Sequence, residues 1–288
     1  MTAEDLKEQL DDRRTEAYLR RIRAERPPRA DGAALRTLQE RHLRSVPFEN
    51  LSIHLGEEIR LEPRALVAKV VDGRRGGFCY ELNGAFATLL VALGFDVTLL
   101  QARVYDGEGL PGIPYDHLTL RVRDVDGGEW LADVGFGAHS LHPLVYDERG
   151  EQADPDGVFR IAEGSSGDLD LFRDGQAQFV LDQRPRALRD FTAGAWYHRT
   201  SPDSHFTRSL VCSLRTEQGR TTLSGSTLTV TENGERRTTE LATDAEVLAA
   251  YRDHFGLSLN RLPNDPAKES KESKECEGSN DPEDSAPA

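Results

Sequence analysis

The sequence is poor in cysteine and has no pattern that would organise a disulfide or metal framework. Its 288 residues include three cysteines, Cys79, Cys212 and Cys276, and none of them has CxxC spacing. An odd count without paired spacing argues against a disulfide framework and against a zinc site. It fits a reducing compartment, and we expect no bound metal.

Long apolar stretches are also missing. No run of about 18 apolar residues is present, so the sequence predicts no membrane-spanning helix and no membrane partner. The first residues, Met1-Thr2-Ala3-Glu4-Asp5, lack the basic start and apolar core of a signal peptide. We therefore expect a cytoplasmic protein.

The sequence has fewer positively charged than negatively charged residues. Lys and Arg number 36 against 50 Asp and Glu, which gives a formal net charge of −14. This balance argues against a nucleic-acid partner. The sequence leaves open whether the protein is a monomer or a homodimer.

The spacing of apolar residues divides the chain into four parts. Residues 1–94 have the period of helices, and residues 95–185 have the period of short, regularly spaced strands. Residues 186–263 mix both signals, whereas residues 264–288 are polar and predict a disordered acidic tail. We expect an α+β fold with an N-terminal helical bundle, a central β-barrel and a C-terminal α/β lid.

Local signals support this division. Asp31 is placed to cap a helix, and Asp126-Gly127-Gly128 is typical of a hairpin between two strands. A second hairpin is predicted at Asn233-Gly234. Thr243 and Glu246 have the spacing of a capping box at the start of a last helix.

One short stretch places a cysteine where a thiol becomes reactive. It reads Arg75-Gly76-Gly77-Phe78-Cys79-Tyr80-Glu81-Leu82-Asn83. The two glycines predict a tight turn, and a helical apolar pattern begins just after it. A thiol at a helix N-terminus lies at the positive end of the helix dipole, which favours thiolate, and the free N–H groups there can stabilise an oxyanion.

A nucleophilic cysteine needs a base and a group that orients the base. His117 stands at the beginning of one predicted strand, and Asp133 stands near the end of the next. Because the Asp126-Gly127-Gly128 turn pairs these strands, their ends near His117 and Asp133 should meet. Asp133 follows an apolar run, where a carboxylate needs a partner.

Each residue has a structural alternative when taken alone. Cys79 could be a buried core residue, His117 a surface or hydrogen-bonded histidine, and Asp133 a cap for the following turn. The three residues together are far more specific than any one of them.

At this point the motifs resemble those of the arylamine N-acetyltransferases. The resemblance covers residues 10–262 and rests on the Cys79 motif, His117 and three further segments. These segments are Val46-Pro47-Phe48-Glu49-Asn50-Leu51, Asp133-Val134-Gly135-Phe136-Gly137 and, more weakly, Ser201-Pro202-Asp203-Ser204-His205-Phe206.

The resemblance implies a chemistry. Cys79, His117 and Asp133 would form a triad like that of papain-type proteases and transglutaminases. An acetyl group would pass from acetyl-CoA, the acyl-donor substrate, to Cys79 and then to an arylamine or arylhydrazine in a ping-pong reaction. No cofactor would stay bound, and the physiological role would be of the kind found in xenobiotic metabolism.

The resemblance also implies binding and supporting residues. An ion pair between Arg75 and Glu49 would brace the segment around Phe48, although both could instead be solvated surface charges. Three aromatic rings could stack on the acceptor, with ordinary core packing as the alternative: Phe48, Phe78 and Phe206. The backbone of Gly135, Phe136 and Gly137 would approach CoA, and its phosphates have as candidates Arg103, Arg121 and Arg208.

Three other functions remain open. An amide synthase would use the same triad to transfer a carrier-bound acyl chain and close a macrolactam. A cysteine peptidase or transglutaminase shares the Cys-His-Asp order but does not require the Pro47-Phe48-Glu49-Asn50 or Gly135-Phe136-Gly137 motifs. A non-enzymatic binding module fits poorly with an intact triad.

Overall fold

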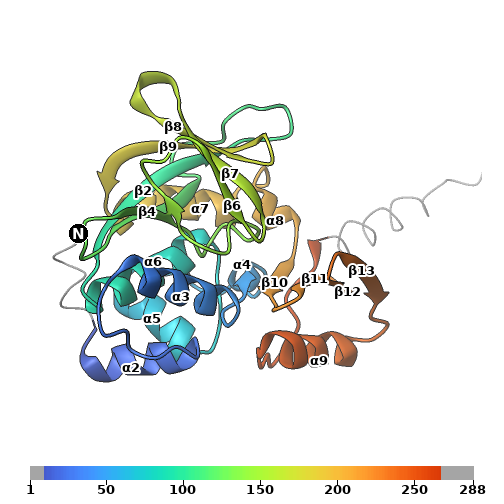
Figure 1. Ribbon diagram of the computed structural model, residues 1–288. Helices are drawn as coiled ribbons and strands as arrows, with labels where there is room; N and C mark the ends of the chain where they lie inside the picture. Colours follow the sequence, from blue (N-terminus) through green and yellow to red (C-terminus); the bar gives the residue numbers. More distant parts are fainter. Residues whose placement is uncertain (1–9, 267–288) are drawn as a thin grey trace, which may run out of the picture.

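The computed structural model describes residues 10–266 and confirms the expected α+β fold (Figure 1). A helical unit, a curled sheet and a smaller sheet with one long helix follow one another along the chain. Residues 267–288, which include most of the predicted acidic tail and Cys276, lie outside the described residues. None of the helices within residues 10–266 is long and apolar enough to cross a membrane.

The helical unit is built from capped helices around one apolar core. The Asp11 side chain accepts a hydrogen bond from the Arg14 N–H, and Asp31 caps the next helix in the same way through Ala34. Pro63 occupies the first turn of a later helix, where its missing N–H costs nothing. The helices are α2 (Asp12–Arg21), α3 (Gly32–Leu43), α4 (Leu51–His54), α5 (Pro63–Val71) and α6 (Cys79–Ala92).

Helix α6 is the centre of this unit. Nearly all of its residues are buried, and it packs against α2, α5 and two strands of the barrel. It begins at Cys79 because Phe78 before it is extended. It stops just before Gly94, which has a φ of +96° that glycine adopts easily. The expected helix after the Cys79 motif is therefore confirmed.

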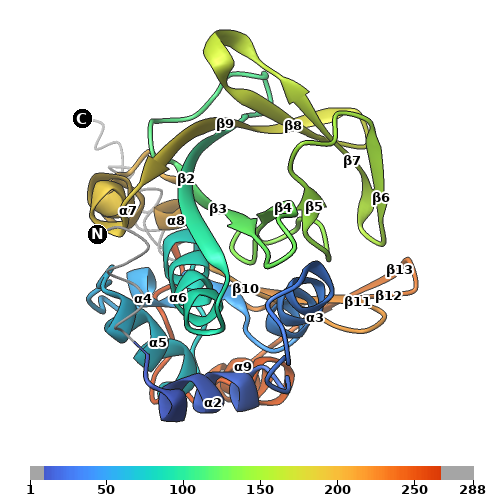
Figure 2. The same cartoon turned by 60° about the vertical axis from the view of Figure 1, so that its left-hand side comes forward.

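The barrel is an eight-stranded antiparallel sheet that curls until it is nearly closed (Figure 2). Its strand order is β5-β4-β3-β2-β9-β8-β7-β6. The predicted hairpin pairs β3 with β4, and Leu120 lies opposite Ala132. The strands are β2 (Asp96–Val104), β3 (His117–Arg123), β4 (Glu129–Ala132), β5 (Leu144–Val145), β6 (Glu151–Asp154), β7 (Gly157–Glu163), β8 (Leu169–Arg173) and β9 (Gln176–Arg186).

The smaller sheet, which we call the lid sheet, has five strands in the order β1-β10-β11-β12-β13, and α9 packs against it (Figure 1). The predicted Asn233-Gly234 hairpin and the Thr243–Glu246 capping box are both present. The strands are β1 (Phe48–Glu49), β10 (Val211–Arg215), β11 (Gly219–Ser224), β12 (Thr227–Glu232) and β13 (Glu235–Glu240), and the helices of this region are α7 (Thr192–Thr200), α8 (His205–Arg208) and α9 (Asp244–Phe255).

One strand of the lid comes from the other end of the chain. Phe48 of β1 pairs with Ser213 of β10, and Glu49 pairs with Cys212. The lid sheet therefore includes residues that sequence periodicity assigns to the helical unit. A strand of two residues is too short to produce a periodic signal.

Candidate active site

Cys79 lies at the first position of α6, and its side chain is buried. The two glycines before it are required by close packing. A Cβ atom on Gly76 would stand 1.8 Å from the Pro47 carbonyl oxygen, and one on Gly77 would stand 2.5 Å from the Glu81 carboxylate. The Glu81 and Leu82 N–H groups both donate to the Phe78 carbonyl at 3.0 Å. The N–H groups of Cys79 and Tyr80 precede these first helical hydrogen bonds, so they are available beside the thiol.

His117 and Asp133 form a buried pair beside Cys79. His117 is the first residue of β3, and Asp133 directly follows β4, so the β3–β4 pairing brings them together. The distance from His117 Nε2 to Asp133 Oδ2 is 2.6 Å. This bond leaves the other ring nitrogen, Nδ1, for Cys79, which is among the groups that raise the His117 pKa. The Cys79 Sγ atom lies 4.0 Å from the Asp116 carbonyl oxygen, next to His117 in the chain.

The charges of this pair support each other. Burial alone would lower the His117 pKa, but the Asp133 carboxylate and the Cys79 side chain outweigh it and raise the pKa to about 10. Burial would raise the Asp133 pKa, but His117 lowers it to about 2. At neutral pH the arrangement therefore holds an imidazolium between the Asp133 carboxylate and the Cys79 sulfur.

Asn83 connects α6 to both strands of the hairpin. Its Nδ2 donates to the Leu118 carbonyl at 2.7 Å and to Asp133 Oδ1 at 2.9 Å, while its Oδ1 accepts from the Val134 N–H at 2.9 Å. Because Asn83 lies one turn after Cys79, these bonds set the position of the thiol relative to the pair. In the sequence Asn83 stands only as one residue of the Cys79 motif, and the signal that marks it is an amide within an apolar helix.

The Gly135-Phe136-Gly137 segment contacts all three residues of the candidate triad. The Gly135 N–H donates to Asp133 Oδ1 at 2.8 Å, and a Cβ atom on Gly135 would stand 2.7 Å from the Cys79 Cα. The Phe136 ring packs on the His117 ring with centroids 5.1 Å apart. Gly135 and Phe136 therefore hold the candidate triad together, which is a packing role that sequence reasoning did not separate from a role toward CoA.

The three aromatic candidates lie in one group but differ in exposure. Phe206 contacts Phe48 and Phe78, with ring centroids 6.1 and 5.6 Å apart. Phe78 is buried and packs edge-on against Tyr80, whereas Phe48 and Phe206 are only partly buried. Of the three rings, Phe48 and Phe206 offer surface to a ligand.

Arg75 and Glu49 form an ion pair behind the Cys79 turn. Arg75 Nε lies 3.0 Å from Glu49 Oε1, and the Glu49 side chain is fully buried. Arg75 also contacts Glu57 at 3.0 Å. Burial would raise the Glu49 pKa, but Lys69 and Arg75 outweigh this and lower it. The second cation, Lys69, pairs with Glu81 at 2.6 Å.

The arrangement supplies a nucleophile, a proton carrier and free N–H donors at one point. These are the parts that acyl transfer through a covalent intermediate requires. Within residues 10–266, no group of three or more His, Cys, Asp or Glu side chains is placed to hold a metal ion.

We expect Asp133→Asn to lower the His117 pKa, because burial then acts on the ring without an opposing carboxylate. In the wild type the raised pKa stabilises the fold fully below about pH 6.5, and this contribution is lost as the pH rises through about 10. Nuclear magnetic resonance titration of the His117 ring protons measures the shift. The exposed Asp253→Asn serves as the control, and an unchanged His117 titration in Asp133→Asn would contradict the assignment.

We expect Arg75→Ala to lower the free energy of unfolding by about 3 kcal/mol or more, because it leaves Glu49 buried without its partner. Urea denaturation measures this difference. Arg60 is more than half exposed, so Arg60→Ala should cost less than about 1 kcal/mol. Equal stability of the Arg75→Ala and Arg60→Ala variants would show that the Arg75 pair does not brace the fold.

Comparisons with known proteins point to one family. The family model described as N-acetyltransferase matches residues 31–263. The arylamine N-acetyltransferase of Mycolicibacterium smegmatis is 35% identical, with 85% of this chain and 92% of the relative aligned. A relative from Salmonella typhimurium, named arylamine N-acetyltransferase / N-hydroxyarylamine O-acetyltransferase, is 34% identical over 79% of this chain and 83% of its own length.

Solved structures show the same likeness. The M. smegmatis enzyme superposes with a TM-score of 0.78 at 33% identity, covering 85% of this chain and 94% of that one. The Mycobacterium marinum arylamine N-acetyltransferase in complex with CoA has a TM-score of 0.77 at 29% identity, covering 84% and 92%. With a matching family model over most of its length and relatives above 30% identity, this chain belongs to the arylamine N-acetyltransferase family and is an acyltransferase of that kind.

Proposed function

We propose that the protein acetylates arylamines and arylhydrazines with acetyl-CoA, through an acetyl group carried on Cys79. The observation that carries the mechanism is the His117–Asp133 pair, 2.6 Å long and buried, set against a thiol at a helix N-terminus. In this mechanism Cys79 is the nucleophile, His117 moves the proton and Asp133 orients the ring.

The first half of the reaction loads the enzyme. The Cys79 thiolate attacks the thioester carbon of acetyl-CoA, and the N–H groups at the start of α6 hold the negative oxygen of the intermediate. The bond to the CoA sulfur then breaks. His117 gives its proton to the departing thiolate, which leaves acetyl-Cys79, neutral His117 and free CoA.

The second half transfers the acetyl group. The amine nitrogen attacks the acetyl carbon, and neutral His117 takes the proton that the nitrogen loses. The carbon–sulfur bond breaks, so that the Cys79 thiolate and the His117 imidazolium return. Asp133 stabilises the imidazolium each time it forms, and this role fits the raised His117 pKa.

The relatives support the two substrates. The M. marinum protein was solved in complex with CoA, and the relatives from M. smegmatis and S. typhimurium are named for action on arylamines. In this chain, the partly exposed Phe48 and Phe206 rings are placed to stack on an aromatic acceptor.

Brief mixing of the protein with acetyl-CoA in the absence of amine should add one acetyl group, because the second half-reaction then has no acceptor. Intact-protein mass spectrometry detects the adduct, and an arylamine such as aniline should remove it. Cys79→Ser should acquire no adduct. The buried Cys212→Ala, which changes a thiol in the lid core, should be acetylated like the wild type.

Two outcomes would contradict the proposal. An adduct on Cys79→Ser that peptide mapping locates away from position 79 would place the acetyl group on another residue. A wild type that acquires no adduct would show that acetyl-CoA is not the donor, and a carrier-bound acyl chain of the amide-synthase type would then become the leading alternative.

A further inference from the structure

Two arginines face each other on the lid sheet. Arg215 of β10 and Arg220 of β11 are register partners in an antiparallel pair, so their side chains lie on the same face. Like charges directly opposite on two strands destabilise a sheet. The Arg215 side chain is only 10% exposed, so water does little to screen this repulsion.

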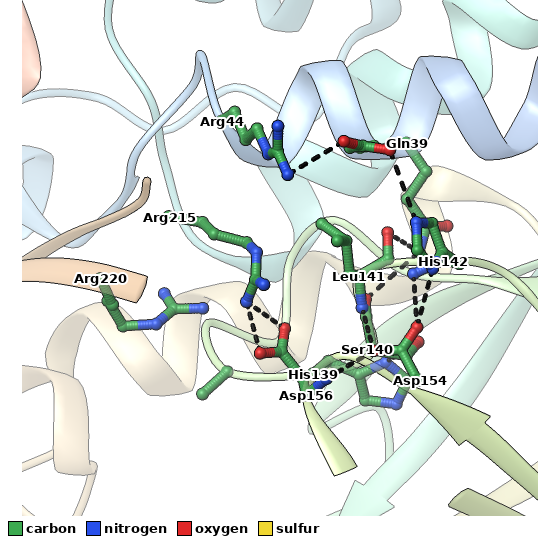
Figure 3. Close-up of polar contacts among 12 residues, drawn as sticks. Gln39, Arg44, His139, Ser140, Leu141, His142, Asp154, Asp156, Arg215 and Arg220 are labelled. Atoms are coloured by element: carbon green, nitrogen blue, oxygen red, sulfur yellow. Dashed lines mark hydrogen bonds and ion pairs between the residues drawn. The ribbon is translucent and has the colours of Figure 1, made fainter. Parts of the chain in front are cut away.

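The partners of these arginines do not balance their charge. Arg215 forms an ion pair with Asp156, in the turn between β6 and β7, and its Nε is buried without a hydrogen-bond partner (Figure 3). Arg220 Nη1 donates to the neutral Ser213 Oγ at 3.1 Å. Figure 3 shows the Arg220 side chain beside that of Arg215.

A third arginine adds to this excess of positive charge. Arg173 of β8 donates from Nη1 to the Ala138 carbonyl at 3.3 Å, and it lies 3.7 Å from the mostly exposed Asp174. Burial lowers the Arg220 pKa; Asp156 raises it, whereas Arg215 and Arg173 lower it further. We call Arg173, Arg215 and Arg220 the arginine cluster. Among the described residues, two carboxylates form ion pairs with the arginine cluster, Asp156 and Asp174, and of these only Asp156 is largely buried.

The arginine cluster borders the candidate active site. Ala138, which Arg173 contacts, directly follows the Gly135-Phe136-Gly137 segment that leaves Asp133. On the lid side, Ser213 is the strand partner of Phe48, and a Cβ atom on Gly137 would stand 3.7 Å from the Phe48 ring. The cluster therefore lies where the barrel, the lid and the Phe48 segment meet.

We infer that the arginine cluster binds phosphate groups of acetyl-CoA, an inference that rests on the proposed function. A guanidinium presents a planar fork of donors that matches phosphate oxygens, and an anion between Arg173 and Arg220 would offset the repulsion of the opposed arginines. In a chain with a formal net charge of −14, such a local excess of cations gives the anionic donor a specific place to bind.

The arginines suggested by the sequence lie elsewhere in the fold, on β2, β3 and α8. The Arg121 guanidinium lies over the Tyr146 ring at 5.5 Å, and Arg208 donates to the Asp203 carbonyl. Arg103, on strand β2 of the barrel and not in the lid sheet, lines a cavity together with Asp168, Asp182 and Arg184. None of these three shares the opposed geometry of Arg215 and Arg220.

The test compares acyl donors that differ in their phosphates: acetyl-CoA, acetyl-dephospho-CoA and acetyl-pantetheine. Arg220→Gln and Arg173→Gln should each raise the KM for acetyl-CoA about tenfold, equivalent to about 1.4 kcal/mol. The KM for acetyl-pantetheine, which has no phosphate, should stay unchanged, as should kcat with saturating acetyl-CoA. If the variants raise the KM for acetyl-CoA but not for acetyl-dephospho-CoA, the cluster binds the 3′-phosphate. If they raise the KM for both donors, the cluster binds the pyrophosphate.

Two controls separate binding from folding. Arg220→Lys keeps the charge and should recover part of the lost affinity, while the exposed Arg252→Gln on α9 should behave as the wild type. Arg215 is left intact because its pair with Asp156 joins the lid to the barrel. Equal rises in KM for acetyl-CoA and acetyl-pantetheine, or no rise with either, would overturn the inference and leave the cluster a structural contact.

The inference and the proposed function can fail separately. Isothermal titration calorimetry with CoA and with pantetheine measures binding without any chemistry. If Arg220→Gln weakens CoA but not pantetheine, the phosphate site stands even where Cys79 is not acetylated. If CoA and pantetheine bind the wild type equally, the phosphate site is refuted even where acetylation proceeds.

Discussion

The active site depends on the contact between the start of α6 and the β3–β4 hairpin. Cys79 comes from the helix and the His117–Asp133 pair from the sheet, so neither unit can form the candidate triad alone. Asn83 fixes the distance between them with three hydrogen bonds, and Gly135 allows the two backbones to approach closely. Because buried polar groups are costly when unpaired, this amide specifies a single register between helix and hairpin.

Buried charge surrounds this contact on both sides. The His117–Asp133 pair lies in front of the helix start, while Glu49, Arg75 and Lys69 lie behind it. Each buried ion is compensated by an opposite charge and by further hydrogen bonds, which a buried pair needs to offset its desolvation. The result is a helix N-terminus whose surroundings are polar but rigid, a condition that keeps a reactive thiol in one orientation.

The sequence predicts those parts of the structure that depend on residues adjacent in the chain. The capped helices, the hairpin turns and the Cys79 motif each depend on residues that are neighbours in the chain, such as Asp31 or Asn233-Gly234, and these were predicted. Strands β5 and β6 carry no such signal, since β5 has two residues and β6 is polar on both faces. Asn83 was missed because its hydrogen-bond partners are distant along the chain, which no local pattern reports. Arg215 and Arg220 are near each other in the chain, but the strand register that sets them opposite and the ion pair of Arg215 with the distant Asp156 are seen only in the folded sheet.

The two-residue strand β1 ties the first part of the chain to the last. Its partner β10 lies in the last third of the sequence, so Phe48 and Glu49 leave the ribosome long before Ser213 and Cys212 exist. The backbone groups of β1 that β10 will satisfy must wait for that segment, and closing such a long loop is slow and entropically costly. The helical unit therefore has one strand, β1, that lacks its β10 partner during most of synthesis. The order in which the two ends of the chain are made thus affects how the enzyme folds.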